Sequence, residues 1–241
     1  MEYRKRSEPR RDNMERPFRQ WNNFEFAGPA PAFTPSGMVF NQMAQMARSV
    51  SQLQLSGYNA ITIEARWQPV DTLAIAMPYE LTPNWNLNPG AIGWGFNSNC
   101  GAYTTNAICT VHRTTSTHTG TRLFIANVDM NDGLSHTTAD TYSSVVNPTG
   151  RLSYVDGILA TFVPMSGYTF TGTDLHGGIA NARLFIAHRG DTNNANWGGG
   201  IARSNLKLQS FRIYNRQLSA AEICQNAWAD YNRFGGAVPG C

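Results

Sequence analysis

Side chains suited to sugar recognition gather in one short, glycine-rich segment of the sequence. Asp191, Asn193, Asn194 and Asn196 stand just before Trp197 in the run GDTNNANWGGG. Sites for small polar ligands combine an apolar surface with a few well-placed hydrogen-bonding groups, and an indole ring supplies such a surface. A tryptophan between asparagine and three glycines is hard to bury. The segment therefore predicts an exposed carbohydrate-binding loop.

Trp85 is a second aromatic candidate for the same ligand, because asparagines flank it in the run PNWNLNPG. The alternative for each tryptophan is packing within the protein. We expect Trp94 to belong to the core. Trp85 could instead pack against its own loop, and the two interpretations of Trp197 stay open.

Two acidic segments could bind calcium, which takes carboxylate and carbonyl oxygens as ligands. They are VDMNDG at 128–133 and the tryptophan-containing segment at 190–200, with Asp129, Asp132 and Asp191 as candidate ligands. Neither segment has EF-hand spacing, and Asp and Asn in glycine-rich stretches also form turns without metal. We expect no cofactor, with calcium as the open alternative.

Residue patterns that perform catalysis are absent from the sequence. Glycoside hydrolysis needs two carboxylates flanking one sugar bond, whereas Glu64 stands alone on its strand-like run and is expected to face solvent. The five histidines lack the spacing of metal-ligating pairs, and His118 and His136 are expected on the surface. Serine-nucleophile and phosphate-binding glycine motifs are also missing. The sequence therefore predicts a protein that is not an enzyme.

The four cysteines could form two local disulfides. Cys100 and Cys109 flank a turn-like stretch, and Cys224 and Cys241 stand near the C-terminus. Pairing neighbours is one of three possible connectivities, and four free thiols are the alternative. The spacings do not match a zinc-binding Cys-x-x-Cys pair. Bridges would imply an oxidising final environment.

From residue 60 onward the sequence consists mainly of short strand-like runs separated by turn residues. In AITIEARW, 60–67, apolar residues alternate with polar ones, as in a strand with two distinct faces. In YVDG, 154–157, an Asp-Gly pair predicts a tight hairpin. MAQMA, 43–47, could form a helical turn. Further strands are predicted over 49–55, 73–77, 91–96, 107–113, 122–128, 136–146, 151–164, 183–189 and 206–216.

One short helix is predicted after the last strand. Ser219 is a suitable N-cap, and Glu222 three residues later completes a capping box. An apolar stripe then recurs every four residues, and two glycines end the helix. The stripe and the terminating pair are Ile223, Ala227, Tyr231, Gly235 and Gly236.

Residues 1–30 differ from the rest of the chain and predict an extended or disordered arm. Residues 1–19 hold seven basic and four acidic side chains, which accounts for the whole formal charge of +3. The remainder, 31–241, is close to neutral and forms one predicted domain. Because no basic surface follows the arm, nucleic acid is an unexpected partner, and docking of the arm on another protein is expected instead.

No run of 18 apolar residues and no secretory signal occur in the sequence, so membrane insertion is not expected. The protein could stay in the cytosol or leave by another route, such as release inside a virus particle. A mature chain without its leader is a further alternative.

The C-terminal run LQSFRIYNRQLSAAEICQNAWADYNRFG, 208–235, resembles the last strand and closing helix of laminin-G-like domains of the bacterial and phage type. These domains belong to the concanavalin A-like lectin/glucanase superfamily. The matching positions are Arg212, Ile213, Tyr214, Asn215, Arg216, Leu218, Ser219, Glu222, Ile223, Asp230, Arg233 and Phe234. AITIEARWQP, YVDG and RLFIAHRG resemble upstream elements in the same order, whereas 78–150 departs from the pattern.

The resemblance implies an all-β fold, a concanavalin A-like jelly-roll β-sandwich with one short C-terminal helix and an extended N-terminal arm. It also implies a non-catalytic surface protein, expected on a phage or phage-like virion or on an extracellular surface. Such a protein would bind cell-surface glycan and contact other virion proteins through its arm. The alternatives are a purely structural capsid or tail cementing protein and a secreted bacterial glycan-binding module. Homo-oligomers are compatible with all three.

Overall fold

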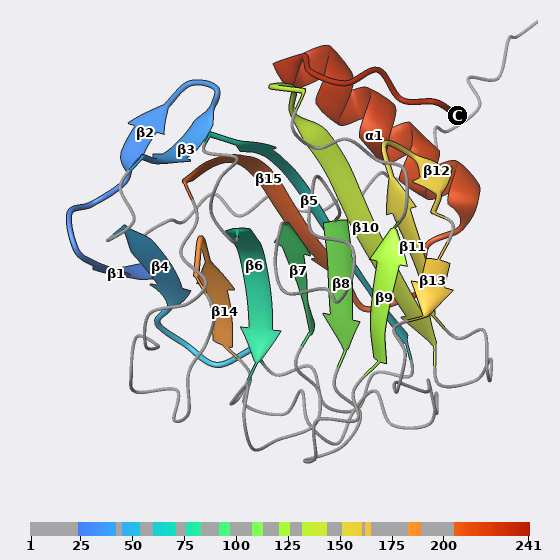
Figure 1. The fold of residues 1–241 in the computed structure, drawn as a ribbon, viewed down its shortest axis with the longest axis horizontal. Coiled ribbons are helices and arrows are strands. Elements are labelled where there is room, and N and C mark those ends of the chain that lie inside the picture. Colours follow the sequence, from blue (N-terminus) through green and yellow to red (C-terminus); the bar gives the residue numbers. More distant parts are fainter. Residues whose placement is uncertain are drawn as a thin grey trace, which may run out of the picture.

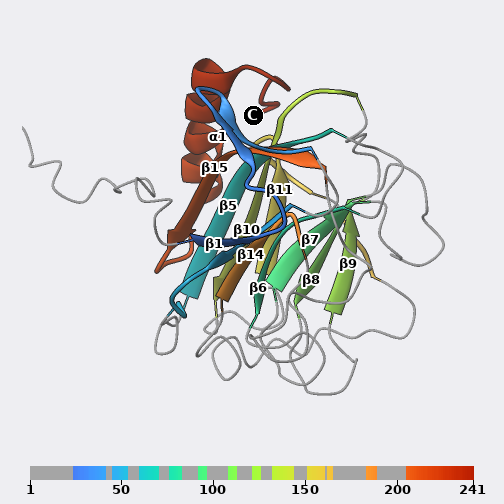
Figure 2. The ribbon, with the colours of Figure 1, turned by 90° about the vertical axis from the view of Figure 1, so that its left-hand side faces the viewer.

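The strands of this protein form two antiparallel sheets packed face to face, and the helix lies outside one of them (Figure 1 and Figure 2). The structure is a computed structural model. It describes residues 24–41, 45–53, 60–70, 76–82, 92–96, 108–112, 121–125, 132–143, 151–160, 162–164, 183–188 and 205–241.

The first sheet has eight strands in the order β1-β4-β14-β6-β7-β8-β9-β13. Their bounds are β1 Phe24–Ala27, β4 Met46–Ser49, β14 Arg183–Ile186, β6 Ala76–Thr82, β7 Ile92–Phe96, β8 Ile108–His112, β9 Thr121–Ile125 and β13 Phe162–Pro164. The second has seven strands in the order β12-β11-β10-β5-β15-β3-β2. Their bounds are β12 Ile158–Leu159, β11 Arg151–Val155, β10 His136–Ser143, β5 Ala60–Pro69, β15 Leu206–Tyr214, β3 Gly37–Phe40 and β2 Ala32–Thr34.

Strand β5 lies at the centre of the seven-stranded sheet, between β10 and β15. Its alternating pattern is confirmed, since Ile61, Ile63 and Trp67 point into the core between the sheets. Across that core lie Tyr79 and Leu81 of β6, and burying each such side chain stabilises the fold by roughly 1.5–3 kcal/mol. The polar residues of β5 occupy the other face, where Asn226 of α1 contacts Glu64 and the C-cap residue Gly235 contacts Arg66.

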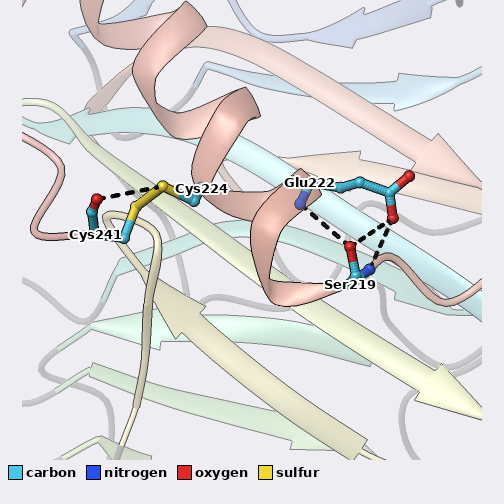
Figure 3. The surroundings of a disulfide bond; sticks show 4 residues. All are labelled: Ser219, Glu222, Cys224 and Cys241. Atoms are coloured by element: carbon cyan, nitrogen blue, oxygen red, sulfur yellow. Dashed lines mark hydrogen bonds between the residues drawn. A yellow bond between two sulfur atoms is a disulfide. The ribbon is translucent and has the colours of Figure 1, made fainter.

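Helix α1, Ala220–Phe234, begins as the sequence predicts. The Ser219 side chain accepts a hydrogen bond from the Glu222 backbone amide, and the Glu222 carboxylate accepts one from the Ser219 amide at 2.9 Å (Figure 3). The helix ends at Gly235, whose φ of 70° suits glycine. Ile223 and Ala227 are buried against the sheet, whereas Tyr231 is only half-buried.

The Asp-Gly hairpin is also confirmed. Asp156 and Gly157 have φ angles of 49° and 82°, the left-handed pair of a type I′ turn, and they join β11 to β12.

Two expectations near the N-terminus need correction. Met46 and Ala47 belong to strand β4 and not to a helical turn, because β4 pairs with β1 on one side and β14 on the other. Strand β1, Phe24–Ala27, lies within the segment assigned to the arm, so the eight-stranded sheet begins before residue 31.

Within the described part of the chain, no helix has both the length and the apolar character needed to cross a membrane.

Candidate functional site

Most of the predicted ligand-binding residues lie outside the described residues. These are Trp85, Asp129, Asp191, Asn193, Asn194, Asn196 and Trp197. The histidine at 118 and the cysteine at 100 also lie outside, and for Trp94 and Cys109 only the strand position is described. The structure does describe the strands that precede and follow these segments, and so shows where each segment begins and ends.

Both ends of the segment 189–204, which contains Trp197, are anchored by described residues. At its start, the Ala187 amide donates to the carbonyl of Pro78 in β6 of the eight-stranded sheet at 3.1 Å. At its end, the Asn205 carbonyl accepts from the Val70 amide at 3.0 Å, beside β5 of the seven-stranded sheet. The segment therefore connects one sheet to the other.

Asp132, just before β10, lies at the same end of the sandwich as Asn205, where this segment ends. Strand β15 begins with Leu206 opposite Pro69, and β10 begins with His136 opposite Trp67. Since β5 separates β10 from β15, the two starting points are about 10 Å apart. By contrast, Trp85 follows β6, whose last residue pairs with the first residue of β14, so its segment leaves from the opposite end of that strand pair.

The Asp132 carboxylate is used in a turn. Its Oδ1 accepts from the Leu134 amide at 2.8 Å and lies 3.0 Å from Nε2 of His136. Among the described residues no three His, Cys, Asp or Glu side chains are arranged to hold a metal ion. The described residues thus supply one candidate calcium ligand, already engaged by the protein itself.

His136 is not a surface residue, which corrects the sequence-based expectation. It is buried at the start of β10, with Nδ1 2.7 Å from Oδ2 of Asp156 and Nε2 facing Asp132. Burial alone would lower the pKa of His136, but the hydrogen bonds and charges of Asp156 and Asp132 outweigh it and raise the pKa. Both ring nitrogens can donate only when the ring is protonated, so this arrangement favours the imidazolium ion.

Glu64 is also buried, and the expectation that it faces solvent was wrong. Its side chain points from β5 toward α1, where Oε2 accepts from the Tyr214 hydroxyl and from Nδ2 of Asn226, each at 2.9 Å. The Oε1 atom is buried without a hydrogen-bond partner among the described residues. The outer face of the strand is covered by the helix, which a strand pattern alone does not reveal.

Burial raises the pKa of Glu64 from 4.5 to about 7, since a charged carboxylate loses its hydration there. The nearby Arg212 guanidinium, with its nitrogen 3.9 Å away, and the two hydrogen bonds lower the pKa without cancelling the effect of burial. A raised pKa is a common property of catalytic acids. Here, however, the carboxyl is fully buried, and the described carboxylate that acts on its pKa, Asp230, is itself bound by Arg212 and Ser210.

A buried ion pair joins the same helix to the sheet. Arg212 of β15 donates two hydrogen bonds to Asp230 of α1, one of them at 2.8 Å, and Ser210 donates a third at 2.9 Å. On the neighbouring strand, Arg66 donates to Thr137 at 2.8 Å and to the Gly235 carbonyl. These contacts hold the helix against the sheet, with Asp230 fully buried and Arg212 half-buried.

The second predicted disulfide is present. Cys224 of α1 and Cys241, the last residue, are bonded, with Cα atoms 5.9 Å apart (Figure 3). The bond holds the C-terminal tail, residues 235–241, against the helix, and Figure 1 shows the tail running back along α1.

The buried polar residues could have been partly anticipated. Asp230 continues the apolar stripe of Ile223 and Ala227 at helical spacing, and a carboxylate in that position calls for a buried cation. Arg212 and Tyr214 share one face of β15, which makes that face the one toward the helix. No local signal identifies Glu64 as their partner, since 150 residues separate it from Tyr214.

No protein-family model and no curated protein sequence matches the chain. Its fold, however, is similar to solved structures. A native heptameric SAP-like pentraxin from Limulus polyphemus matches with a TM-score of 0.54 and 12% identity, over 85% of this chain and 82% of the pentraxin. The binding domain of botulinum neurotoxin serotype C1 matches with a TM-score of 0.56 and 11% identity, over 86% of this chain.

The chain spans less than half of the toxin domains, 47% for serotype C1. A further match, at 11% identity and a TM-score of 0.55, is botulinum neurotoxin type C, a toxin that interacts with two ganglioside molecules. At these identities the likeness shows the fold alone. The chain is an all-β jelly-roll sandwich of the concanavalin A-like kind, with one short C-terminal helix.

Proposed function

We propose that this protein is a non-catalytic, lectin-like module that binds carbohydrate on a cell surface. The observation that carries the proposal is the closure of one sheet face. Helix α1 covers the outer face of the seven-stranded sheet and engages its acidic residue, Glu64, in internal hydrogen bonds. Ligand recognition is then left to the eight-stranded sheet and to the segments that connect the strands, and we place it in the latter.

The proposed site is the segment that contains Trp197, with Asp191, Asn193, Asn194 and Asn196 as hydrogen-bonding groups. Its anchoring at Ala187 and Asn205 supports this choice, because binding loops work best when rigid strands position both ends. Trp85 is a weaker candidate, since its segment leaves from the other end of the β6–β14 pair.

Known proteins with this fold support a binding role. The similar toxin structures are binding domains, and botulinum neurotoxin type C interacts with gangliosides, which are glycolipids. We extend to this chain only the general role, that of a carbohydrate-binding module.

The finer proposal places the module on a phage or phage-like virion, or on another extracellular surface, with the segment before β1, residues 1–23, docking on a neighbouring protein. The basic composition of residues 1–19 and the resemblance of residues 208–235 support this placement. The disulfide between Cys224 and Cys241 supports an oxidising final environment.

A broad glycan array tests the proposal. The purified full-length chain is applied with calcium and with a calcium chelator. We expect saturable binding to a restricted set of glycans, and loss of binding in chelator would show that calcium takes part. Absence of binding under both conditions contradicts carbohydrate recognition and favours the structural, cementing role. Turnover of any arrayed glycan would contradict a non-catalytic function.

A further inference from the structure

The disulfide between Cys224 and Cys241 is placed where a reductant can reach it. Cys241 is exposed, and Cys224 is only half-buried on α1. The two cysteines are 17 residues apart, so the bond closes a short loop made of the helix and the tail. Exposed disulfides are the ones most open to attack by a thiolate.

Near the disulfide, glycines allow the backbone of the tail to lie in close contact with the rest of the protein. A Cβ atom at Gly236 would lie 2.6 Å from both the Arg66 guanidinium and the Ser135 carbonyl oxygen. A Cβ at Gly240 would clash with Ile158, and one at Gly157 would clash with the Cys241 sulfur. The tail therefore lies directly on the start of β10 and on the β11–β12 hairpin.

Two backbone hydrogen bonds connect the tail to these elements. The Ala237 amide donates to the Ser135 carbonyl at 2.9 Å, and the Gly240 amide donates to the Asp156 carbonyl at 3.1 Å. Ser135 precedes His136, and the Asp156 side chain binds both His136 and the Thr137 amide. The tail thus contacts both Ser135, which precedes the buried His136, and Asp156, which binds its ring.

Without the disulfide, little holds residues 235–241 in this position. Besides the disulfide, the described contacts of these residues include two tail-to-body hydrogen bonds, the Arg66 contact at Gly235, the close approach of Gly240 to Ile158 and the burial of Ala237 and Pro239. Ordering seven residues, three of them glycines, costs conformational entropy that so few contacts do not offset. The covalent bond is therefore what keeps the tail in place.

We infer that the Cys224–Cys241 disulfide is a reducible latch, whose opening releases residues 235–241 and loosens the turn at 132–137 and the β11–β12 hairpin. An incoming dithiol supplies two electrons and two protons. It becomes a disulfide, while Cys224 and Cys241 each become a thiol. This device is independent of the proposed carbohydrate site.

The remainder of α1 stays docked in the reduced protein, because its main contacts do not involve sulfur. Ile223 and Ala227 remain buried, and Asp230 keeps its hydrogen bonds with Arg212 and Ser210. The latch therefore acts on the tail and not on the whole sandwich.

Hydrogen–deuterium exchange of the full-length chain tests this inference. The background is a Cys100→Ser, Cys109→Ser variant, in which the latch is the one remaining cysteine pair. Exchange is compared before and after reduction and alkylation, with alkylation alone as the control. A variant that also carries Cys224→Ser and Cys241→Ser gives the same comparison without chemical treatment.

We expect exchange of the Ala237 and Gly240 amides to accelerate more than fivefold on reduction, with a smaller acceleration at 134–137 and at Asp156. Amides of β5 and of residues 224–233 should change less than twofold. A tail acceleration below fivefold would show that other contacts hold the tail. An equal acceleration in β5 would show that reduction unfolds the sandwich and does not open a latch.

Discussion

At the residue scale, the main finding is that two buried titratable side chains favour their protonated forms. Glu64 lies under α1, and His136 lies between Asp132 and Asp156. Both pKa values are raised relative to their ordinary values, so the folded protein binds protons more tightly than the unfolded chain at each position. Their contributions to stability are present at lower pH and are lost as pH rises.

Replacing Glu64 by Gln should remove one part of this pH dependence. Stability from the protonated carboxyl is fully present below pH 4.5 and is lost as pH rises through about 7. Across that window the free energy of unfolding of the wild-type protein should fall by roughly 3 kcal/mol relative to that of Glu64→Gln. Each unit by which the pKa is raised is worth about 1.4 kcal/mol. Urea unfolding at pH 5 and pH 8 measures the difference.

The Tyr214→Phe variant is the matched control for this experiment. It removes a hydrogen bond that favours the charged carboxylate, so the loss of stability should still begin near pH 4.5 but continue to higher pH than in the wild type. If Glu64→Gln and wild type show the same pH dependence, Glu64 is ionised throughout and our interpretation of its environment is wrong.

His136 should titrate above the ordinary histidine value of 6.5. Its stabilising effect is fully present below 6.5 and is lost as pH rises through the folded-state pKa, because the neutral ring cannot donate to both carboxylates. Nitrogen chemical shifts of the histidine rings, assigned with a His136→Gln variant, measure the titration. An Asp156→Asn variant should lower the pKa, and a His136 midpoint at or below 6.5 in the wild type would refute the assignment.

At the scale of elements, helix α1 is the part of the fold that depends most on local sequence signals. Its start at Ser219 was predictable to the residue, because the capping box is a short pattern with one physical meaning. Its docking was less predictable. A strand pattern such as that of β5 distinguishes two faces but does not tell what covers the outer one, so Glu64 was wrongly expected to face solvent.

The capping box makes a specific prediction about stability. Ser219→Ala should destabilise the protein by about 1 kcal/mol, because the Glu222 amide loses its partner. Glu222 has its pKa lowered to about 2, mainly by hydrogen bonds with Arg216 and Ser219. Its contribution is therefore present above pH 4.5 and is lost as pH falls toward 2, opposite in sign to that of Glu64.

A double-mutant cycle with Ser219→Ala and Glu222→Ala, followed by thermal unfolding, measures this interaction. The two substitutions should be non-additive, since each removes part of the same box. Gln225, exposed on the same helix, offers a neutral control through Gln225→Ala. Additive effects would mean that the two residues cap the helix independently.

At the scale of the whole molecule, the fold was predictable and the candidate site remains a prediction. Alternating strands, the Asp-Gly hairpin and the closing helix predicted a β-sandwich, since each constrains which faces can be buried, and the resemblance of residues 208–235 implied its jelly-roll form. The order of the strands in each sheet could not be predicted, because it depends on pairing between strands far apart in the sequence. The pairing of β14 with both β4 and β6 is an example. Glycan recognition depends on polar loop side chains, for which no periodic pattern exists.

The central claim is that carbohydrate binding belongs to the segment at 190–197 and not to the helix-covered face. The most direct test measures binding of the best array glycan by two variants, Trp197→Ala and Trp228→Ala. Trp228 is the matched control, being a tryptophan exposed on α1. Our account predicts at least tenfold weaker binding for Trp197→Ala and unchanged binding for Trp228→Ala, with both variants folded by circular dichroism. Unchanged binding by Trp197→Ala, or loss confined to Trp228→Ala, would contradict it.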